Sequence, residues 1–320
     1  MKMRVAYVLL VTVLTIAGAG STAAQETPAV TIAASTFDST TTGLYAVKAG
    51  LFKKAGLNVT FVPMNPSAIL PAVAGGTIQI ANSNLLNVIE AHARHVPFTV
   101  VAPSAMFNDS DVNGYVGLVV SKDSTARTGR DFNGKTLAVP SINDLNTIAS
   151  KAWIDKNGGD SSSVHYIEMP PTAALPAVTA GRVDATILTT PFLMQAVDGG
   201  SVRVVTDAYT AISKQYLGLG WFTTEDFAAK NRDVIERFVR VMHDAAVYCN
   251  AHQAQTSDMM AELAKQDPTV VRRMKRVLFA QYLTAPLIQP LVDVAAKYKV
   301  IGASFNAQEL ISPYALKPPR

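Results

Sequence analysis

Short apolar runs alternate with segments of helical spacing along most of the chain. The apolar runs are rich in β-branched residues, are too short for helices and end in polar turns. We expect strands near residues 30–33, 59–62, 78–81, 98–102, 136–139, 165–168, 185–188 and 202–206. Helices are expected between them, near residues 44–49, 65–75, 85–93, 143–156, 172–180 and from 191 onward. This alternation predicts an α/β fold with mostly parallel sheets flanked by helices.

The order of elements restarts near Thr136, which predicts two lobes. After residues 217–222 the pattern becomes helical, with expected helices at 233–251, 256–265, 269–279 and 286–298. Two extended segments, near Val116–Ser121 and 215–223, are the expected crossovers and hinge. We expect lobe one at residues 27–118, lobe two at 119–214, and a return to lobe one at 215–320. The C-terminal helices should pack on lobe one.

An internal repeat supports the division into two lobes. Residues 68–78 align with residues 173–183, and each copy reads as a helix that ends at a glycine before a buried strand. Two similar α/β lobes imply a cleft between them. In open α/β sheets, ligands bind beyond the carboxyl ends of the strands.

The N-terminus has the pattern of an export signal. Lys2 and Arg4 precede an apolar run that is too short to span a bilayer, and small residues follow it. We expect a signal peptide at residues 1–24 and a mature chain that begins at Gln25. No cysteine stands near this position to accept a lipid. The sequence therefore predicts an unlipidated protein of the periplasm.

Composition narrows the functional class. Loss of the signal peptide removes two positive charges, so the formal net charge falls from +4 to +2. This balance does not favour nucleic-acid binding, for which basic residues would be concentrated. The single cysteine, Cys249, reads as a buried helical residue. The five histidines show no metal-binding spacing. We expect no metal, no cofactor and a monomeric chain.

Hydroxyl, amide and aromatic side chains are concentrated in the loops that follow the predicted strands. From these loops and the return segment we take the candidate ligand-binding residues Phe37, Asp38, Thr40, Asn65, Ser83, Asn84, Phe107, Ser141, Asn143, Thr189, Thr190, Phe192 and Trp221. Free N–H groups at helix starts also bind anions. For any one of these residues an ordinary helix-capping role remains open.

Four stretches of the chain resemble a known family. They are residues 43–59, 131–141, 180–192 and 224–238. Together they are similar to the nitrate/sulfonate/taurine type of ABC-transporter substrate-binding protein, a group that also includes binders of thiamine-pyrimidine precursors. The resemblance implies a type II periplasmic-binding fold and delivery of a small molecule to an inner-membrane permease. It also leaves open a ligand sensor that docks onto a receptor kinase, since fold and pocket would be the same.

Signals for catalysis are weak. Residues 129–136 match the phosphate-loop pattern G-x-x-x-x-G-K-T, but a strand rather than a helix should follow Lys135, which predicts a turn. There is no G-x-S-x-G nucleophile motif. Thiamine-pyrimidine synthases of eukaryotes share the expected fold, but they are intracellular and cysteine-rich at their site. We therefore expect a binding protein and not an enzyme.

The candidate loops contain no lysine or arginine. Strongly anionic ligands are often held by a guanidinium group, whose paired, charge-assisted hydrogen bonds are strong. Phe37, Phe107, Phe192 and Trp221 are expected to wall the cleft. Asp38 and Asp144 are candidate acceptors for amino or ring N–H groups. The sequence thus favours a neutral or weakly charged organic ligand, such as a heterocycle or an aromatic acid.

Overall fold

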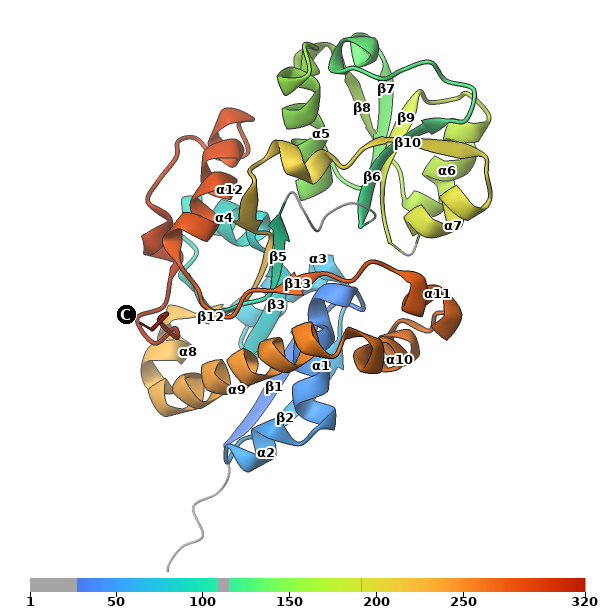
Figure 1. Cartoon of the computed structure of the whole chain (residues 1–320). Coiled ribbons are helices and arrows are strands. Elements are labelled where there is room, and N and C mark those ends of the chain that lie inside the picture. The colour runs from blue at the N-terminus through green and yellow to red at the C-terminus, as the bar shows by residue number, and fades with distance from the viewer. Residues whose placement is uncertain (1–27, 109–114, 191, 320) are drawn as a thin grey trace, which may run out of the picture.

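Two α/β lobes make up the described part of the chain. The computed structural model describes residues 28–108, 115–190 and 192–319. Each lobe is built on one five-stranded sheet, and a short three-stranded sheet lies where the chain passes between the lobes (Figure 1). The expected signal peptide lies outside the described residues. Within the described residues, no helix is both long enough and apolar enough to cross a membrane.

The first sheet has the strand order β2-β1-β3-β12-β4. Its strands are β1 (Ala29–Ala34), β2 (Asn58–Pro63), β3 (Ile80–Asn84), β4 (Phe98–Pro103) and β12 (Leu219–Thr224). One face packs against α1 (Thr41–Lys48) and α9 (Arg232–Ala251), and the other packs against α3 (Pro66–Ala74) and α4 (Leu85–Ala93). Buried residues of α9 recur at helical spacing, which makes one side of this long helix part of the core.

The second sheet has the strand order β10-β6-β9-β7-β8. Its strands are β6 (Val116–Ser121), β7 (Thr136–Val139), β8 (His165–Glu168), β9 (Ala185–Thr189) and β10 (Val202–Thr206). The helix α5 (Leu145–Lys156) covers one face, and α6 (Pro171–Thr179) and α7 (Phe192–Asp198) cover the other. The phosphate-loop pattern is indeed a turn, because the 3₁₀ segment η2 (Gly129–Phe132) leads directly into β7.

The repeat found in the sequence corresponds to equivalent elements of the two lobes. In the first lobe, α3 is followed by Gly76 with φ 74°, and the N–H of Ile78 donates to the carbonyl of Ala72. In the second, α6 ends at Gly181 with φ 68°, and the N–H of Val183 donates to Ala177. A left-handed glycine closes each helix at the same position. The repeat is therefore structural.

The crossovers differ from the sequence expectation. The segment Val116–Ser121 is not a crossover but strand β6, which pairs with β9 and β10 inside the second sheet, so a boundary at residue 118 cuts through a strand. The connections instead use β5 (Ala105–Asn108) and β11 (Gln215–Leu217), which pair antiparallel with each other, and β5 also pairs with β13 (Leu278–Phe279). The sheets are mixed, since β12 and β6 run antiparallel to their neighbours.

The C-terminal helices lie mainly on the first lobe. The helix α9 packs against α1 and β4, and α10 (Gln253–Ala264) packs against α1. Residues 269–279 do not form one helix as expected. They divide into α11 (Pro268–Arg273), an irregular stretch and β13. The last helix, α12 (Ala285–Lys297), packs against α4 and β11.

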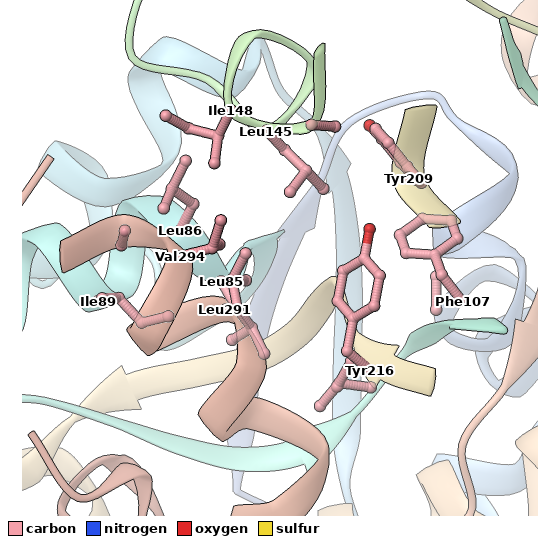
Figure 2. Packing of buried hydrophobic residues seen from close by; sticks show 14 of the residues in the cluster. Leu85, Leu86, Ile89, Phe107, Leu145, Ile148, Tyr209, Tyr216, Leu291 and Val294 are labelled. Carbon is pink, nitrogen blue, oxygen red and sulfur yellow. The ribbon is translucent and has the colours of Figure 1, made fainter. Parts of the chain in front are cut away.

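Among the described residues, the lobes are in contact both beside the crossovers and between α7 and α11. Beside the crossovers, apolar residues of α4, α12 and α5 pack together, and the hydroxyl of Tyr298 donates to Asp155 Oδ2 at 2.7 Å. Figure 2 shows this packing, with the Phe107, Tyr209 and Tyr216 rings beside it. Elsewhere, Arg273 at the end of α11 pairs with Asp198 at the end of α7, with 2.7 Å between Nη2 and Oδ2. The first contact is an apolar core, and the second combines an exposed ion pair with packing of Met194 against Met260 and Val271.

Candidate ligand-binding site between the lobes

The strand directions bring the loops of both lobes to one region. In the second sheet, β6 begins at the crossover and leads away from it. Strands β9 and β10 both run antiparallel to β6, so they end beside the crossover. Strand β7 is parallel to β9 and ends at the same edge. In the first sheet, the last residue of β3, Asn84, pairs with Leu219, which follows the crossover strand β11. The loops after β3, β7, β9 and β10 therefore all lie near the crossovers.

Four aromatic rings form the floor of this region. The ring of Phe107 on β5 lies 5.6 Å from Tyr115, 4.8 Å from Tyr209 and 5.5 Å from Tyr216, measured between centroids. A Cβ at Gly218 would stand 2.2 Å from Phe107 Cε2, so only glycine allows the ring to occupy this position. The Tyr209 hydroxyl donates to Asn146 on α5 at 2.9 Å. We call Phe107, Tyr115, Tyr209 and Tyr216 the aromatic floor.

Buried polar atoms without a hydrogen-bond partner among the described residues occur in both lobes. Three lie on residues that belong to the aromatic floor or bond to it: Thr190 Oγ1, Asp207 Oδ2 and the Tyr216 hydroxyl. The others are Ser39 Oγ, Thr42 Oγ1, both amide atoms of Asn82, the Tyr166 hydroxyl, Arg203 Nε and Trp221 Nε1. A buried polar group left without a partner costs about 1–3 kcal/mol, so the three beside the floor need an explanation. A polar ligand between the lobes would satisfy them.

The first-lobe loop and the second-lobe strands come together at Tyr115. The N–H of Thr190 donates to the Tyr115 carbonyl at 2.9 Å. Burial raises the pKa of Tyr115 above its ordinary value, and the nearby Asp38 carboxylate raises it further. Asp38 belongs to the loop after β1 and Thr190 follows β9. These contacts place the strand-end loops of the two lobes on either side of Tyr115.

Two acids of the second lobe are held in an environment that favours their protonated form. Burial raises the pKa of Asp207 to about 8, although the N–H of Tyr209 and the charge of Lys275 oppose the shift. Burial also raises the pKa of Asp144, against hydrogen bonds from Thr147 and Asn146. Both acids lie near Tyr209, whose own pKa they raise. Perturbed acids in an interlobe region favour a functional site over a purely structural one.

A buried ion pair lies on the first-lobe side of the site. Arg276 Nε donates to Asp38 Oδ1 at 2.6 Å, and both side chains are almost fully buried. The second Asp38 oxygen accepts from the N–H of Val277 at 2.9 Å. The remaining Arg276 nitrogens donate to Gln253, Ser257 and Thr41. Asp38 thus balances the guanidinium charge, and the pair fixes the loop after β1 to the segment before β13.

Two hollows among the described residues differ in size and position. One of about 10 Å³, the size of a single water, lies against the floor and is lined by Phe107, Tyr115 and Arg276 among others. The other, of about 280 Å³, lies at the opposite edge of the second sheet beside Lys135 and Asp184, which form a 3.3 Å ion pair. The larger hollow lies away from the strand-end loops, so it is not the interlobe site.

Comparison with known proteins assigns the family. The model of the family described as "NMT1/THI5 like" matches residues 38–256. The chain belongs to this family. Among curated proteins, it is similar to the formylaminopyrimidine-binding protein of Halalkalibacterium halodurans, with 29% identity over 143 residues. That alignment covers 44% of this chain and 41% of the relative, so it spans less than half of either protein.

Solved structures share the fold. The periplasmic aliphatic sulphonate-binding protein SsuA of Escherichia coli superposes with a TM-score of 0.73 at 17% identity, covering 91% of this chain and 94% of SsuA. The periplasmic nitrate-binding protein NrtA of Synechocystis PCC 6803 gives a TM-score of 0.74 at 11% identity, covering 90% and 87%. The expected type II periplasmic-binding fold is confirmed. At these identities the likeness concerns the fold and not the ligand.

The structure brings some predicted site residues together. Phe107 lies in the aromatic floor and Thr190 beside it, while Ser83 is buried at the end of β3. Asp38 and Thr40 are buried in the loop after β1, but their side chains bond within the protein: Asp38 to Arg276, and Thr40 to the Phe37 carbonyl at 2.8 Å. These residues line or support the site.

Other predicted residues have ordinary capping or surface positions. Asn65 and Asn84 cap α3 and α4 by accepting from Ser67 and Leu86. Ser141 donates to Glu168 at 3.2 Å. The remaining four are Phe37, 40% exposed, Asn143, also exposed, and the half-buried Thr189 and Phe192.

Trp221 does not line the hinge side of a cleft, contrary to expectation. It is fully buried on β12, on the face covered by α1 and α9. A Cβ at Gly43 would lie 2.6 Å from Trp221 Cη2, and the Phe238 ring meets the indole edge at 5.7 Å. Because side chains alternate between the two faces of a strand, Trp221 points to the face opposite Phe222. It belongs to the core of the first lobe.

Sequence reasoning missed five residues of the site: Tyr115, Asp207, Tyr209, Tyr216 and Arg276. Asp207 directly follows β10, so the strand-end rule that selected Thr190 would also have selected Asp207. Tyr216 lies in the expected crossover at residues 215–223, from which the sequence analysis selected Trp221 instead. Arg276 was assigned to a helix, and no local pattern shows that it pairs with Asp38 across 238 positions.

Proposed function

We propose that this chain is the solute-binding component of an ABC importer and that it captures a small organic molecule between its lobes. The observation that carries the proposal is a set of buried, unpartnered polar atoms on residues that belong to the aromatic floor or bond to it, namely the Tyr216 hydroxyl, Thr190 Oγ1 and Asp207 Oδ2. Membership of the NMT1/THI5-like family and the named roles of the similar proteins support it. A permease at the inner membrane is the proposed partner.

The proposed mechanism is closure around the ligand. A ligand that contacts both lobes binds the closed arrangement better than an open one, and therefore shifts the population towards closure. Atoms from the two lobes, such as Ser39 Oγ and Thr190 Oγ1, would then share one ligand. The importer would distinguish loaded from empty protein by this closed arrangement.

The proposed ligand is neutral or weakly charged and contains a ring. Aromatic side chains form the floor, and Arg276, the one buried arginine among the described residues, is paired with Asp38. The similar formylaminopyrimidine-binding protein is named for a heterocyclic ligand of this kind. The nitrate- and sulphonate-binding proteins share the fold at lower identity. A heterocycle is therefore favoured over a small inorganic anion.

A binding role is proposed rather than catalysis. Burial raises the pKa of the Cys249 thiol to about 12, so Cys249 does not supply a thiolate nucleophile at neutral pH. Clusters of three or more metal-binding side chains are absent from the described residues. We propose that the protein acts in the periplasm after removal of residues 1–24. N-terminal sequencing of a periplasmic extract should give Gln25, and an intact chain in the membrane fraction would contradict export in this form.

A thermal-shift screen tests the proposal. The panel contains nitrate, alkanesulfonates, pyrimidines and aromatic carboxylates. A ligand present at about one hundred times its Kd should stabilise the protein by about 2.7 kcal/mol. Tyr216→Phe should reduce this shift without loss of stability, because it removes a hydroxyl that is unpartnered in the protein. Tyr166→Phe, which removes a hydroxyl on the outer strand β8, is the matched control and should leave the shift unchanged. The absence of any shift across the panel would contradict the proposal.

A further inference from the structure

Asp207 is a buried acid that the fold leaves half-satisfied. It follows β10 at the edge where the second sheet meets the crossovers. Its Oδ1 accepts from the N–H of Tyr209 at 3.0 Å, whereas its Oδ2 is buried and has no partner among the described residues. A turn needs only the first of these oxygens. Among the described residues, the second oxygen has no hydrogen-bond partner.

The charged groups around Asp207 define what it can accept. Lys275, in the stretch before β13, lies close enough to lower its pKa. Tyr209 and Tyr216 face it from η4 (Ala208–Ala211) and β11, and Asp144 on the far side of Tyr209 is a second acid whose pKa burial raises. An added anion would meet two acids that already resist ionisation. An added cation would allow Asp207 to ionise.

We propose that Asp207 determines ligand choice by accepting, through Oδ2, hydrogen bonds from a protonated amino or amidinium group of the ligand. This inference rests on the proposed capture of a small organic molecule between the lobes, and it replaces the neutral ligand considered above with a basic amine or amino-heterocycle bound as its cation. The ligand keeps its own proton. The carboxyl proton leaves Oδ2 for the solvent as the ion pair forms, so charge and protons balance.

Proton release on binding tests this step. With a pKa of about 8, Asp207 is roughly nine-tenths protonated at pH 7 and roughly one-tenth protonated at pH 9. Binding of a cation that ionises it should release about 0.9 proton per ligand at pH 7 and about 0.1 at pH 9. Titration calorimetry with benzamidine in buffers of different ionisation enthalpy measures this number. Benzamide and benzoate are the matched probes without a cationic group.

The expected result is that benzamidine binds while benzamide and benzoate bind at least ten-fold more weakly. Asp207→Asn keeps the acceptor for the Tyr209 N–H and removes the charge, so it should weaken benzamidine binding at least ten-fold. Asp267→Asn is the control, because Asp267 caps α11 by a similar 2.8 Å bond to Thr269 but is exposed. Equal binding of benzamidine by the wild type and Asp207→Asn would overturn the assignment.

A second readout does not depend on any ligand. In the folded protein Asp207 stays protonated up to about pH 8, whereas an ordinary Asp ionises near 3.8. The unfolded state therefore binds fewer protons between these values, and the stability falls as pH rises through this window. Asp207→Asn should reduce the fall in Tm between pH 5 and pH 8, whereas Asp267→Asn should leave that fall unchanged.

These outcomes separate the inference from the proposed function. Tight binding of benzoate or a sulfonate, without binding of benzamidine, would overturn the role of Asp207 but keep a solute-binding protein. No proton release at pH 7 on benzamidine binding would overturn the ion-pair step. A wild-type Tm with the same pH dependence as Asp207→Asn would overturn the buried-acid argument itself.

Discussion

The ion pair between Arg273 and Asp198 is expected to act as a latch between the lobes. Arg273 ends α11 on the first lobe and Asp198 ends α7 on the second, 2.7 Å apart. The neighbouring residue, Arg272, pairs at 2.8 Å with Asp258 on α10, within the first lobe. The chain thus offers two adjacent arginines with similar ion pairs, of which only one joins the lobes. The perturbation is Arg273→Ala, and Arg272→Ala is the control.

The expected effect is small because both pairs are exposed. The side chains of Arg273 and Asp198 are 59% and 51% exposed, and those of Arg272 and Asp258 are 57% and 58% exposed. Exposed pairs of this kind contribute about 0.2–1 kcal/mol. If that energy exists only in the closed arrangement, Arg273→Ala lowers the closed-to-open ratio by a factor of about 1.4–5. Met194 of α7, which packs near Met260 and Val271, would retain part of the contact.

Single-molecule fluorescence energy transfer measures this ratio. Dyes attached at Ser67→Cys and Thr179→Cys lie on the equivalent exposed helices of the two lobes, and the native Cys249 is buried. Arg273→Ala should reduce the closed population, whereas Arg272→Ala should not. The difference should shrink at 1 M salt, where charges are screened beyond about 3 Å. Equal effects of the two substitutions, or no effect of either, would refute the latch.

Further predictions concern the support of the site. Asp38→Asn leaves Arg276 buried without its counter-charge and should destabilise the fold by about 3–5 kcal/mol, measured by urea denaturation; a loss below 1 kcal/mol would contradict a buried pair. Gly218→Ala should displace the Phe107 ring and weaken ligand binding, and unchanged affinity would place the ligand away from the aromatic floor. Trp221→Ala should cost about 3–5 kcal/mol in stability, because the indole is fully buried in the first-lobe core, and near-wild-type stability would contradict that position.

Much of the fold follows from local signals in the sequence. The apolar runs predicted the strands, and the two copies of the repeat ended as expected at Gly76 and Gly181 in left-handed conformation. The turn at residues 129–136 was predicted from the strand that follows Lys135. These features depend on residues close in the chain.

The errors share a physical cause, which is pairing between distant segments. Val116–Ser121 has the pattern of an extended segment whether it crosses between lobes or pairs within a sheet, and only its partners β9 and β10 decide. Arg276 was hidden in a predicted helix, because its partner Asp38 lies near the other end of the chain. Trp221 was assigned to the cleft because of the strand it lies on, without regard to which face of that strand its side chain occupies. The candidate site was therefore only partly predicted.

The central claim is that one small molecule binds between the lobes, and native mass spectrometry of the chain from Gln25 tests it most directly. The protein is incubated with a small-molecule extract, and variants at the interlobe site and at the distant hollow are compared. We predict one bound molecule per chain, lost in the double variant Tyr216→Phe/Thr190→Val and kept in Lys135→Ala. No bound molecule, or one that is lost in Lys135→Ala and kept in the interlobe variant, would contradict the account.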